Sequence, residues 1–182
     1  MKRYLSATIL FFLVPASAMA QRGSAEVFGG YSFLRANALE GANLDGWNAS
    51  VGGKINNWLG LIGDFSGHYG TPNALVFGPL RGLDASMHSF LFGPRLYGPE
   101  YGVVSPYVHA LFGVARSAAS GFGISTTDAA FAMALGGGAD LKLNRAFTIR
   151  LFQVDYLPTR FFNDRQDNAR ISTGIVFHFR VE

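Results

Sequence analysis

The sequence predicts an all-β protein, an eight-stranded antiparallel up-and-down transmembrane β-barrel. Three observations predict it. Eight segments alternate apolar side chains with small or polar ones, at the period of two that places neighbours on opposite faces of a strand. After the first 20 residues, no apolar run approaches the roughly 20 residues of a membrane-spanning helix. Charged residues make up 15% of the chain, against about 25% in ordinary soluble domains, while the apolar content is too high for disorder.

The N-terminus has the form of a secretory signal peptide. A basic segment and an apolar stretch lead to Ala18 and Ala20, which form an A-x-A cleavage site. A membrane anchor is the alternative, although the apolar stretch is shorter than a spanning helix. We therefore expect residues 1–20 to be a signal peptide and residues 21–182 to be one exported domain. The chain has no cysteine, so that domain must be stable without disulfides.

The charge balance argues against a nucleic-acid partner. The full chain has 15 Lys and Arg residues against 12 Asp and Glu residues. Loss of Lys2 and Arg3 with the signal peptide leaves 13 − 12 = +1, which is too small an excess for a basic binding surface. The four His residues lack the spacing of metal ligands. We therefore expect no nucleic acid, no metal and no other cofactor.

Four strands are predicted in the first half of the chain. Strand 47–56 alternates most cleanly, with Trp47, Val51 and Ile55 on one face. Strand 86–97 contains Pro94, which lacks a backbone donor and predicts a bulge or an early strand end. The predicted strands are 26–34, 47–56, 59–69 and 86–97, and the connections are a polar loop at 35–45, a short turn at 56–58 and a loop with Pro and Gly at 70–85.

Four more strands are predicted in the second half. Strand 105–116 is fairly apolar on both faces, whereas strand 129–142 alternates large apolar residues with small ones. Long connections at one end of the barrel and short turns at the other are typical of transmembrane barrels, and with both chain ends at the short-turn side that side faces the periplasm. The predicted strands are 105–116, 129–142, 147–156 and 168–179, with shorter turns at 98–104 and 143–146 and long loops at 117–128 and 157–167.

The two faces of the predicted strands differ in kind as well as in polarity. One face carries Leu, Val, Ile and Phe, and has Tyr31, Phe33, Trp47, Phe177 and Phe179 near strand ends, as in the aromatic girdles of membrane barrels. The other carries Gly, Ala, Ser and Asn with isolated charges, which suits a narrow lumen. A secreted soluble ligand-binding barrel is an alternative, but its outer face would show more Lys, Glu, Thr and Gln.

The last predicted strand carries a motif of its own. Ser172, Gly174, Phe177 and Phe179 follow the order polar, x, Gly, x, x, aromatic, x, aromatic, which resembles the C-terminal signal read by the outer-membrane β-barrel assembly machinery. With the eight-strand plan and the segments 27–33 and 136–144, the chain resembles the OmpA-type outer-membrane β-barrel domain family, small eight-stranded porin-like barrels, over about the whole mature chain. Residues 180–182 displace inward the terminal Phe often seen in that family.

This resemblance implies a place in the cell outer membrane of Gram-negative type. The expected partners are outer-membrane lipid, lipopolysaccharide and, during biogenesis, the assembly machinery, and we expect a monomer. The role implied is structural or one of surface contact in the cell envelope. Apolar residues at 75–77 and 161–162 either contact lipopolysaccharide or a partner, or fold over the barrel mouth.

Charged residues on the polar face predict a network in the lumen. Asp140 and Arg150 lie nearly level across the turn 143–146, and Asp155 and Arg170 are equally far from the middle of the last loop, so both are candidate cross-strand pairs. Arg150 and Asp155 have opposite parity, so both point inward only if their strand bulges, near Phe152. Pairing is expected because a lone buried charge is costly. The expected network is Lys54, Asp64, Arg95, Asp140, Lys142, Arg150, Asp155 and Arg170.

Eight strands enclose an interior just wide enough for side chains to fill. We therefore expect the network to plug the lumen, and a narrow gated channel for small solutes, in which charge pairs exchange partners, is the alternative. Catalysis is not expected. Ser86 and His88 share a face near Asp84, but nothing shows the mutual orientation that a nucleophile and its base require, and Ser89 points to the opposite face from His88.

Overall fold

The computed structural model describes residues 24–36, 42–70, 84–121, 124–161 and 164–180. The predicted signal peptide with Ala18 and Ala20 and the apolar residues 75–77 lie outside these ranges. The described residues contain no helix long and apolar enough to cross a membrane. The strands are β1 (Ser24–Ala36), β2 (Ala42–Lys54), β3 (Leu59–Gly70), β4 (Asp84–Tyr97), β5 (Val104–Gly121), β6 (Ile124–Lys142), β7 (Phe147–Phe161) and β8 (Asp164–Arg180).

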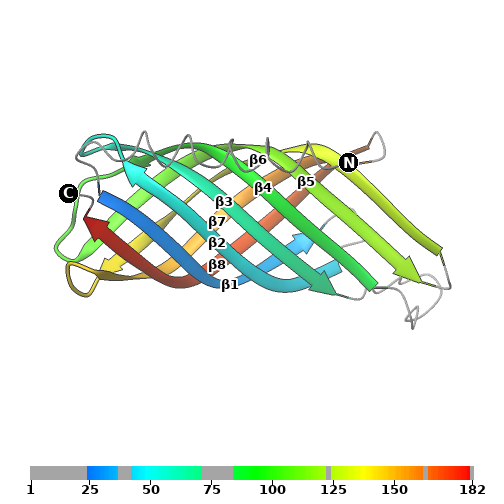
Figure 1. Ribbon diagram of the computed structural model, residues 1–182, viewed down its shortest axis with the longest axis horizontal. Helices are drawn as coiled ribbons and strands as arrows, with labels where there is room; N and C mark the ends of the chain where they lie inside the picture. Colours follow the sequence, from blue (N-terminus) through cyan, green and yellow to red (C-terminus); the bar gives the residue numbers. More distant parts are fainter. Residues whose placement is uncertain (1–23, 37–41, 71–83, 122–123, 162–163, 181–182) are drawn as a thin grey trace, which may run out of the picture.

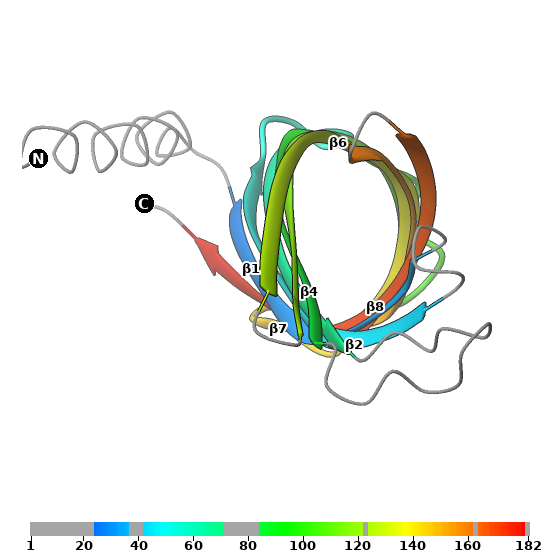
Figure 2. The ribbon, with the colours of Figure 1, turned by 90° about the vertical axis from the view of Figure 1, so that its right-hand side faces the viewer.

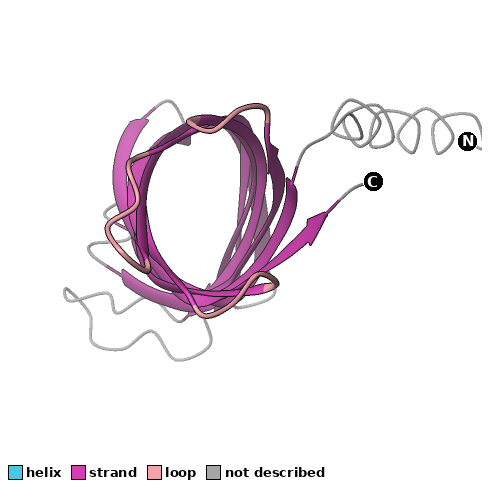
Figure 3. Ribbon diagram, turned by 90° about the vertical axis from the view of Figure 1, so that its left-hand side faces the viewer, coloured by secondary structure: helices cyan, strands magenta, loops and turns pink. Residues whose placement is uncertain are grey.

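The eight strands form one closed barrel in sequence order, with every neighbouring pair antiparallel (Figure 1). β1 also pairs with β8, from Ser24 opposite Arg180 to Arg35 opposite Ala169, and Figures 2 and 3 show the resulting ring from its two ends. The predicted eight-stranded up-and-down barrel is confirmed. We call the end with residues 55–58, 98–103 and 143–146 the short-turn end, and the opposite end the loop end.

The strands are steeply staggered around the barrel. Following paired residues once around the ring, a path that leaves β2 at Lys54 returns to β2 at Leu44, a shear of 54 − 44 = 10 residues. Barrels of this kind have strands tilted by about 35–45° to the axis. The path visits Lys54, Gly60, Arg95, His109, Gly136, Asp155, Arg170, Leu34 and Leu44.

The alternation of the strands separates an apolar outer surface from a buried interior. Outward-pointing residues such as Val51, Phe92 and Ile175 are exposed, whereas their neighbours along each strand are buried in the lumen. Tyr31 and Trp47 are paired across β1 and β2 and both point outward. Trp47 lies well inside β2 rather than at its end, because β2 begins at Ala42, earlier than predicted.

The strands at the loop end are longer than predicted. β5 and β6 remain paired to Gly121 opposite Ile124, and β7 and β8 to Phe161 opposite Asp164. The predicted loops 117–128 and 157–167 are therefore wrong over most of their length. Each segment is polar in composition, but the backbone groups of the hairpin satisfy one another whichever side chains they carry.

Pro94 does not shift the register, contrary to the prediction of a bulge or an early end. β4 continues to Tyr97, and its register with β5 is the same at Phe92, opposite Phe112, as at Arg95, opposite His109. The missing donor of the proline therefore interrupts pairing locally and leaves the register unchanged.

β7 carries a bulge close to Phe152, where the parity of its charges predicts one. The register shifts by one residue between Arg150 and Phe152 against β6, and between Arg150 and Gln153 against β8. Leu151 and Phe152 consequently both point outward, with 44% and 49% of their surface exposed. Arg150 and Asp155 both reach the lumen as a result.

Candidate functional site in the barrel lumen

The predicted network residues divide into a buried group and a pair at the mouth. Lys54 and Lys142 are the last residues of β2 and β6, so they lie at the short-turn mouth and are not part of the buried network, contrary to expectation. Lys142 pairs with Glu100 in the turn 98–103. The buried members are Asp64, Arg95, Asp140, Arg150, Asp155 and Arg170.

Arg170 holds two carboxylates from opposite sides of the lumen. Its Nη1 donates to Asp64 Oδ1 at 2.8 Å, and its Nε and Nη2 donate to Asp155 Oδ2 at 2.8 and 2.6 Å. Asp64 lies on β3 and Asp155 on β7, so the triad spans the barrel interior. All three side chains are at most 1% exposed. The sequence predicts the Asp155–Arg170 pair but not the second carboxylate of Arg170.

Neutral and imidazole groups add further hydrogen bonds to the two carboxylates. Asn48 Nδ2 donates to Asp64 Oδ2 at 2.9 Å, and Gln153 Nε2 donates to Asp155 Oδ2 at 2.9 Å. His109 Nε2 lies 2.7 Å from Asp155 Oδ1. A buried ion pair is tolerated when such additional hydrogen bonds complete it.

A second cluster lies toward the short-turn end. Arg150 donates to both oxygens of Asp140, from Nε at 2.9 Å and from Nη2 at 3.1 Å. Its Nη1 donates to Gln153 Oε1 at 3.0 Å, and the Tyr107 hydroxyl donates to the same oxygen at 2.9 Å. Gln153 therefore joins this cluster to the Arg170 triad, because its amide group donates to Asp155.

A third ion pair lies beside the second cluster in the lumen, against Tyr107. Arg95 Nη1 donates to Glu26 Oε1 at 2.7 Å. The Arg95 guanidinium carbon lies 4.2 Å from the centre of the Tyr107 ring, and that of Arg150 lies 4.7 Å from it. Tyr107 is thus in contact with two cations, an arrangement that cation–π attraction favours in a desolvated site.

Charges in the lumen nearly balance. Among the described residues, three arginines and four carboxylates are buried, which gives 3 − 4 = −1 with histidines neutral. Each buried carboxylate accepts a hydrogen bond from an arginine. The buried cations are Arg95, Arg150 and Arg170, and the buried carboxylates are Glu26, Asp64, Asp140 and Asp155.

Sequence reasoning missed Glu26, Asn48, Tyr107, His109 and Gln153. All five have the lumen-facing parity of their strands, and that parity was a usable signal. Charges that flank a connection predict only contacts between the two strands of one hairpin. Glu26 and Arg95 are on β1 and β4, strands that do not pair with each other, so no reading of hairpins alone finds their contact.

The loop end of the lumen carries no buried charge among the described residues. Its apolar side chains belong to one cluster, which continues along β3 past Asp64 to Ile62. Hydroxyl groups lie beside it: Ser66 and Ser89 are 2.7 Å apart, and Ser32 is 2.9 Å from Ser172. We call this region the neutral section and the region of ion pairs the charged section. The cluster of the neutral section includes Leu34, Leu44, Ala85, Met87, Ala115, Ala132 and Leu157.

The last strand places its predicted signal residues on two faces. Phe177 and Phe179 are exposed on the outer surface, and the Phe177 ring packs edge-on against Phe147 at 4.9 Å. Ser172 is buried in the lumen. Gly174 lies opposite Gly30 of β1, where a Cβ would stand 2.3 Å from the Gly29 carbonyl oxygen, so this closing seam needs a residue without a side chain.

His88 and Ser89 lie on opposite faces of β4, as the alternation predicts. His88 points outward and Tyr69 is its hydrogen-bond partner at 2.9 Å, while Ser89 is buried in the lumen. Within the described ranges, no group of three or more His, Cys, Asp or Glu side chains could hold a metal ion.

A closed barrel with an apolar outer surface and a polar, side-chain-filled lumen defines an integral membrane β-barrel of the small class. The chain belongs to the outer membrane protein beta-barrel domain family, whose model matches residues 5–179. It is therefore a protein of the Gram-negative outer membrane, and the predicted resemblance is confirmed. No curated protein sequence matches the chain.

Solved outer-membrane barrels share this fold. Ail, the attachment invasion locus protein of Yersinia pestis, is 21% identical with a TM-score of 0.60, covering 87% of this chain and 100% of Ail. Neisserial surface protein A is 14% identical with a TM-score of 0.66, covering 86% of this chain and 97% of that protein. OprG of Pseudomonas aeruginosa is 13% identical with a TM-score of 0.58, covering 87% and 97%.

Proposed function

We propose that this protein is an outer-membrane barrel with a sealed lumen that serves envelope structure and surface contact, and that it does not conduct solutes. The observation that carries the proposal is the complete burial of Arg95, Arg150 and Arg170, each paired with a carboxylate inside the lumen. Arg170 connects β8 to β3 and β7, so its ion pairs cross the path that a solute would take.

The energy of these pairs favours a plug over a gate. Removing one partner of a buried ion pair typically costs about 3–5 kcal/mol. A pore through the charged section would have to separate the Arg150–Asp140 pair and both contacts of Arg170. A narrow gated channel therefore needs new partners for each group. Arg170 is the residue where such an exchange would begin, because it already holds two carboxylates.

Conductance of the refolded full-length chain in planar bilayers tests the plug. The wild type is expected to give no channel steps. A variant in which Arg150, Asp140, Arg170, Asp64 and Asp155 are all replaced by alanine removes every ion pair that such a pore must separate, leaves none of their charges unpaired, and is expected to conduct. Arg116→Ala is the matched control, because Arg116 is an exposed arginine on the outer surface. Regular conductance of the wild type would favour the gated channel instead.

For surface contact, we infer that the loop end meets lipopolysaccharide. Ail has been crystallised with the heparin analogue sucrose octasulfate, an anionic saccharide. In this chain His88 and Arg116 are paired across β4 and β5 toward the loop end and both are exposed, so they suit phosphate groups of a lipid. Arg116→Gln should weaken retention of lipopolysaccharide by the purified protein. Unchanged retention would oppose this contact.

We also propose that residues 172–179 are read by the barrel assembly machinery. The outward Phe177 and Phe179 and the closing position of Gly174 support this proposal. Gly174→Asp with Phe177→Ala should block membrane assembly, and unchanged insertion would contradict it.

A monomer is proposed because the closed ring leaves no strand edge free for pairing, and analytical ultracentrifugation in detergent tests it.

A further inference from the structure

The short-turn mouth of the barrel contains a pocket that the plug does not use. Its volume is about 540 Å³, within the range of about 300–1,000 Å³ of small-ligand pockets. It lies on the mouth side of the charged section, beyond Glu26 and Arg95. The residues that bear on its chemistry are Lys54, Lys142, Arg145, Thr148 and His178.

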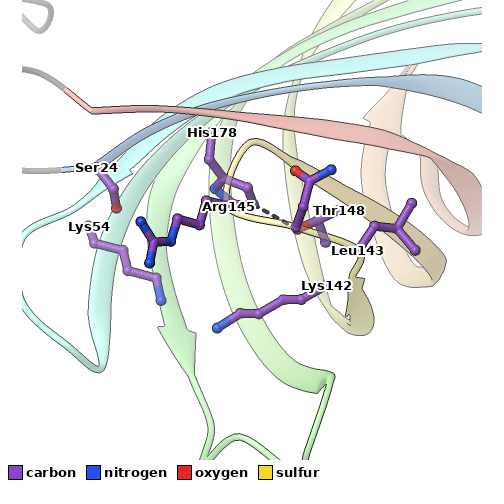
Figure 4. A pocket seen from close by; sticks show the side chains of 8 residues that line it. Ser24, Lys54, Lys142, Leu143, Arg145, Thr148 and His178 are labelled. Atoms are coloured by element: carbon purple, nitrogen blue, oxygen red, sulfur yellow. Dashed lines mark hydrogen bonds between the residues drawn. The ribbon is translucent and has the colours of Figure 1, made fainter.

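Three cationic side chains converge in this pocket. Figure 4 shows the nitrogen ends of Lys54, Arg145 and Lys142 pointing into the same space. Glu100 pairs with Lys142. Among the described residues, neither Lys54 nor Arg145 has a carboxylate partner, and Lys54 instead lies 4.2 Å from the centre of the Tyr97 ring. Lys54 and Arg145 therefore face the pocket without an ion-pair partner among the described residues. The pKa of Glu100 is lowered by the hydrogen bond and charge of Lys142 and also by the charge of Lys54.

The turn that carries Arg145 is held in place. Asn144 Oδ1 accepts hydrogen bonds from the backbone N–H groups of Ala146 at 2.8 Å and Phe147 at 2.9 Å. The Ala146 carbonyl oxygen in turn accepts a hydrogen bond from the His178 N–H at 2.8 Å, which ties the turn to β8. Arg145 thus projects from a fixed backbone, so less freedom is lost when its guanidinium binds an anion.

A hydroxyl and an imidazole complete the lining. His178 Nε2 lies 3.0 Å from Thr148 Oγ1, and both side chains border the pocket. They provide hydrogen-bonding groups beside the cations. A guanidinium presents a planar fork that fits two oxygens of one phosphate, and lysine ammonium groups bind phosphate as point charges.

We propose that this mouth pocket binds a phosphate-bearing anion from the periplasmic side, held by Arg145 and Lys54 with Lys142 at its edge. The same chemistry fits a free phosphorylated compound and the phosphate of an anionic lipid headgroup. The site lies at the opposite end of the barrel from the contact proposed for lipopolysaccharide, so neither depends on the other.

Calorimetric titration of the refolded full-length chain with inorganic pyrophosphate, in a phosphate-free non-ionic detergent at low salt, tests this site. Binding is expected, and it should weaken as sodium chloride is raised. Arg145→Gln with Lys54→Gln should lower the affinity about tenfold or more, since two charge-assisted contacts are lost. Arg35→Gln removes an exposed charge outside the pocket and should leave the affinity unchanged.

Absence of pyrophosphate binding to the wild type overturns the proposal, as does equal binding by the double variant. If the double variant migrates at the same position in a detergent gel with and without boiling, it is not folded as a barrel, and Arg145→Gln alone is used. Repeating the titration in nanodiscs identifies the source. Weaker pyrophosphate binding in phosphatidylglycerol than in phosphatidylcholine indicates a lipid headgroup in the pocket, and equal binding indicates a soluble phosphorylated compound.

Discussion

The charged and neutral sections of the lumen are filled in different ways by the same eight strands. In the charged section each side chain requires a particular partner, as Arg170 requires Asp64 and Asp155. In the neutral section, residues such as Met87 and Ala132 need only a suitable volume. Alternation is therefore enough to specify a neutral interior, whereas a charged interior also needs the register of every strand pair.

The largest effect is expected from replacing Arg170, the arginine that pairs with both Asp64 and Asp155. Arg170→Met leaves Asp64 and Asp155 buried without their cation, so the free energy of unfolding should fall by about 3–5 kcal/mol. Guanidinium unfolding from lipid vesicles measures it. Adding Asp64→Asn and Asp155→Asn should recover much of the loss, because the uncompensated charges are then gone. A loss below about 1 kcal/mol for the single variant would contradict the proposed role of the triad.

A smaller effect is expected at Gly136, where the charged section has no room for a side chain. A Cβ on Gly136 would stand 2.2 Å from Asp155 Oδ1 and 2.3 Å from the Val154 carbonyl oxygen. Because Arg170 and His109 hold Asp155 in place, Gly136→Ala should destabilise the barrel by about 1–3 kcal/mol. Gly29→Ala is the matched control, since its Cβ would meet nothing within 4 Å, and similar losses for both variants would refute this reasoning.

The neutral section should tolerate an exchange of equal volume. Met87 is buried in its cluster, and Met87→Leu should cost less than about 1.5 kcal/mol because volume-conserving apolar exchanges repack. The same unfolding measurement applies. A loss as large as that of Arg170→Met would show that the two sections are equally specific, and the comparison would fail.

The parts of this structure that follow from the sequence are those set by parity. Alternation predicts the closed barrel, and the opposite parity of Arg150 and Asp155 predicts the bulge that the structure has. The polar segments 117–128 and 157–167 were predicted as loops because composition does not reveal a hairpin whose backbone pairing continues.

Contacts across the lumen do not follow from the sequence. The partner of Asp64 on β3 is Arg170 on β8, and the two strands are not neighbours. Their meeting depends on the closing pair of β1 and β8 and on the shear of the whole ring. A single hairpin determines neither the closing strand pair nor the shear. The sequence therefore predicts the pair Asp140–Arg150 within one hairpin, but not Asp64–Arg170 or Glu26–Arg95.

The smallest effect is expected outside both sections, at the ion pair of Glu100 and Lys142. The side chains are 53% and 40% exposed, so Lys142→Met should cost less than about 1 kcal/mol at neutral pH. The hydrogen bond and the charge of Lys142 lower the pKa of Glu100 below its usual value of 4.5. A carboxyl group with a lowered folded-state pKa contributes stability above its unfolded pKa and loses it as the pH falls through the folded value.

The difference between wild type and Lys142→Met should therefore be present at neutral pH and be lost as the pH falls through the lowered pKa of Glu100. In a Glu100→Gln background the same substitution should show no such pH dependence, because no carboxylate remains to titrate. The free energies of unfolding of the wild type, Lys142→Met, Glu100→Gln and the double variant are measured across this pH range. If Lys142→Met lowers the free energy of unfolding equally at every pH in both backgrounds, Lys142 acts through packing at the mouth. The expected pattern would show that strong electrostatic contributions to stability lie in the buried charged section.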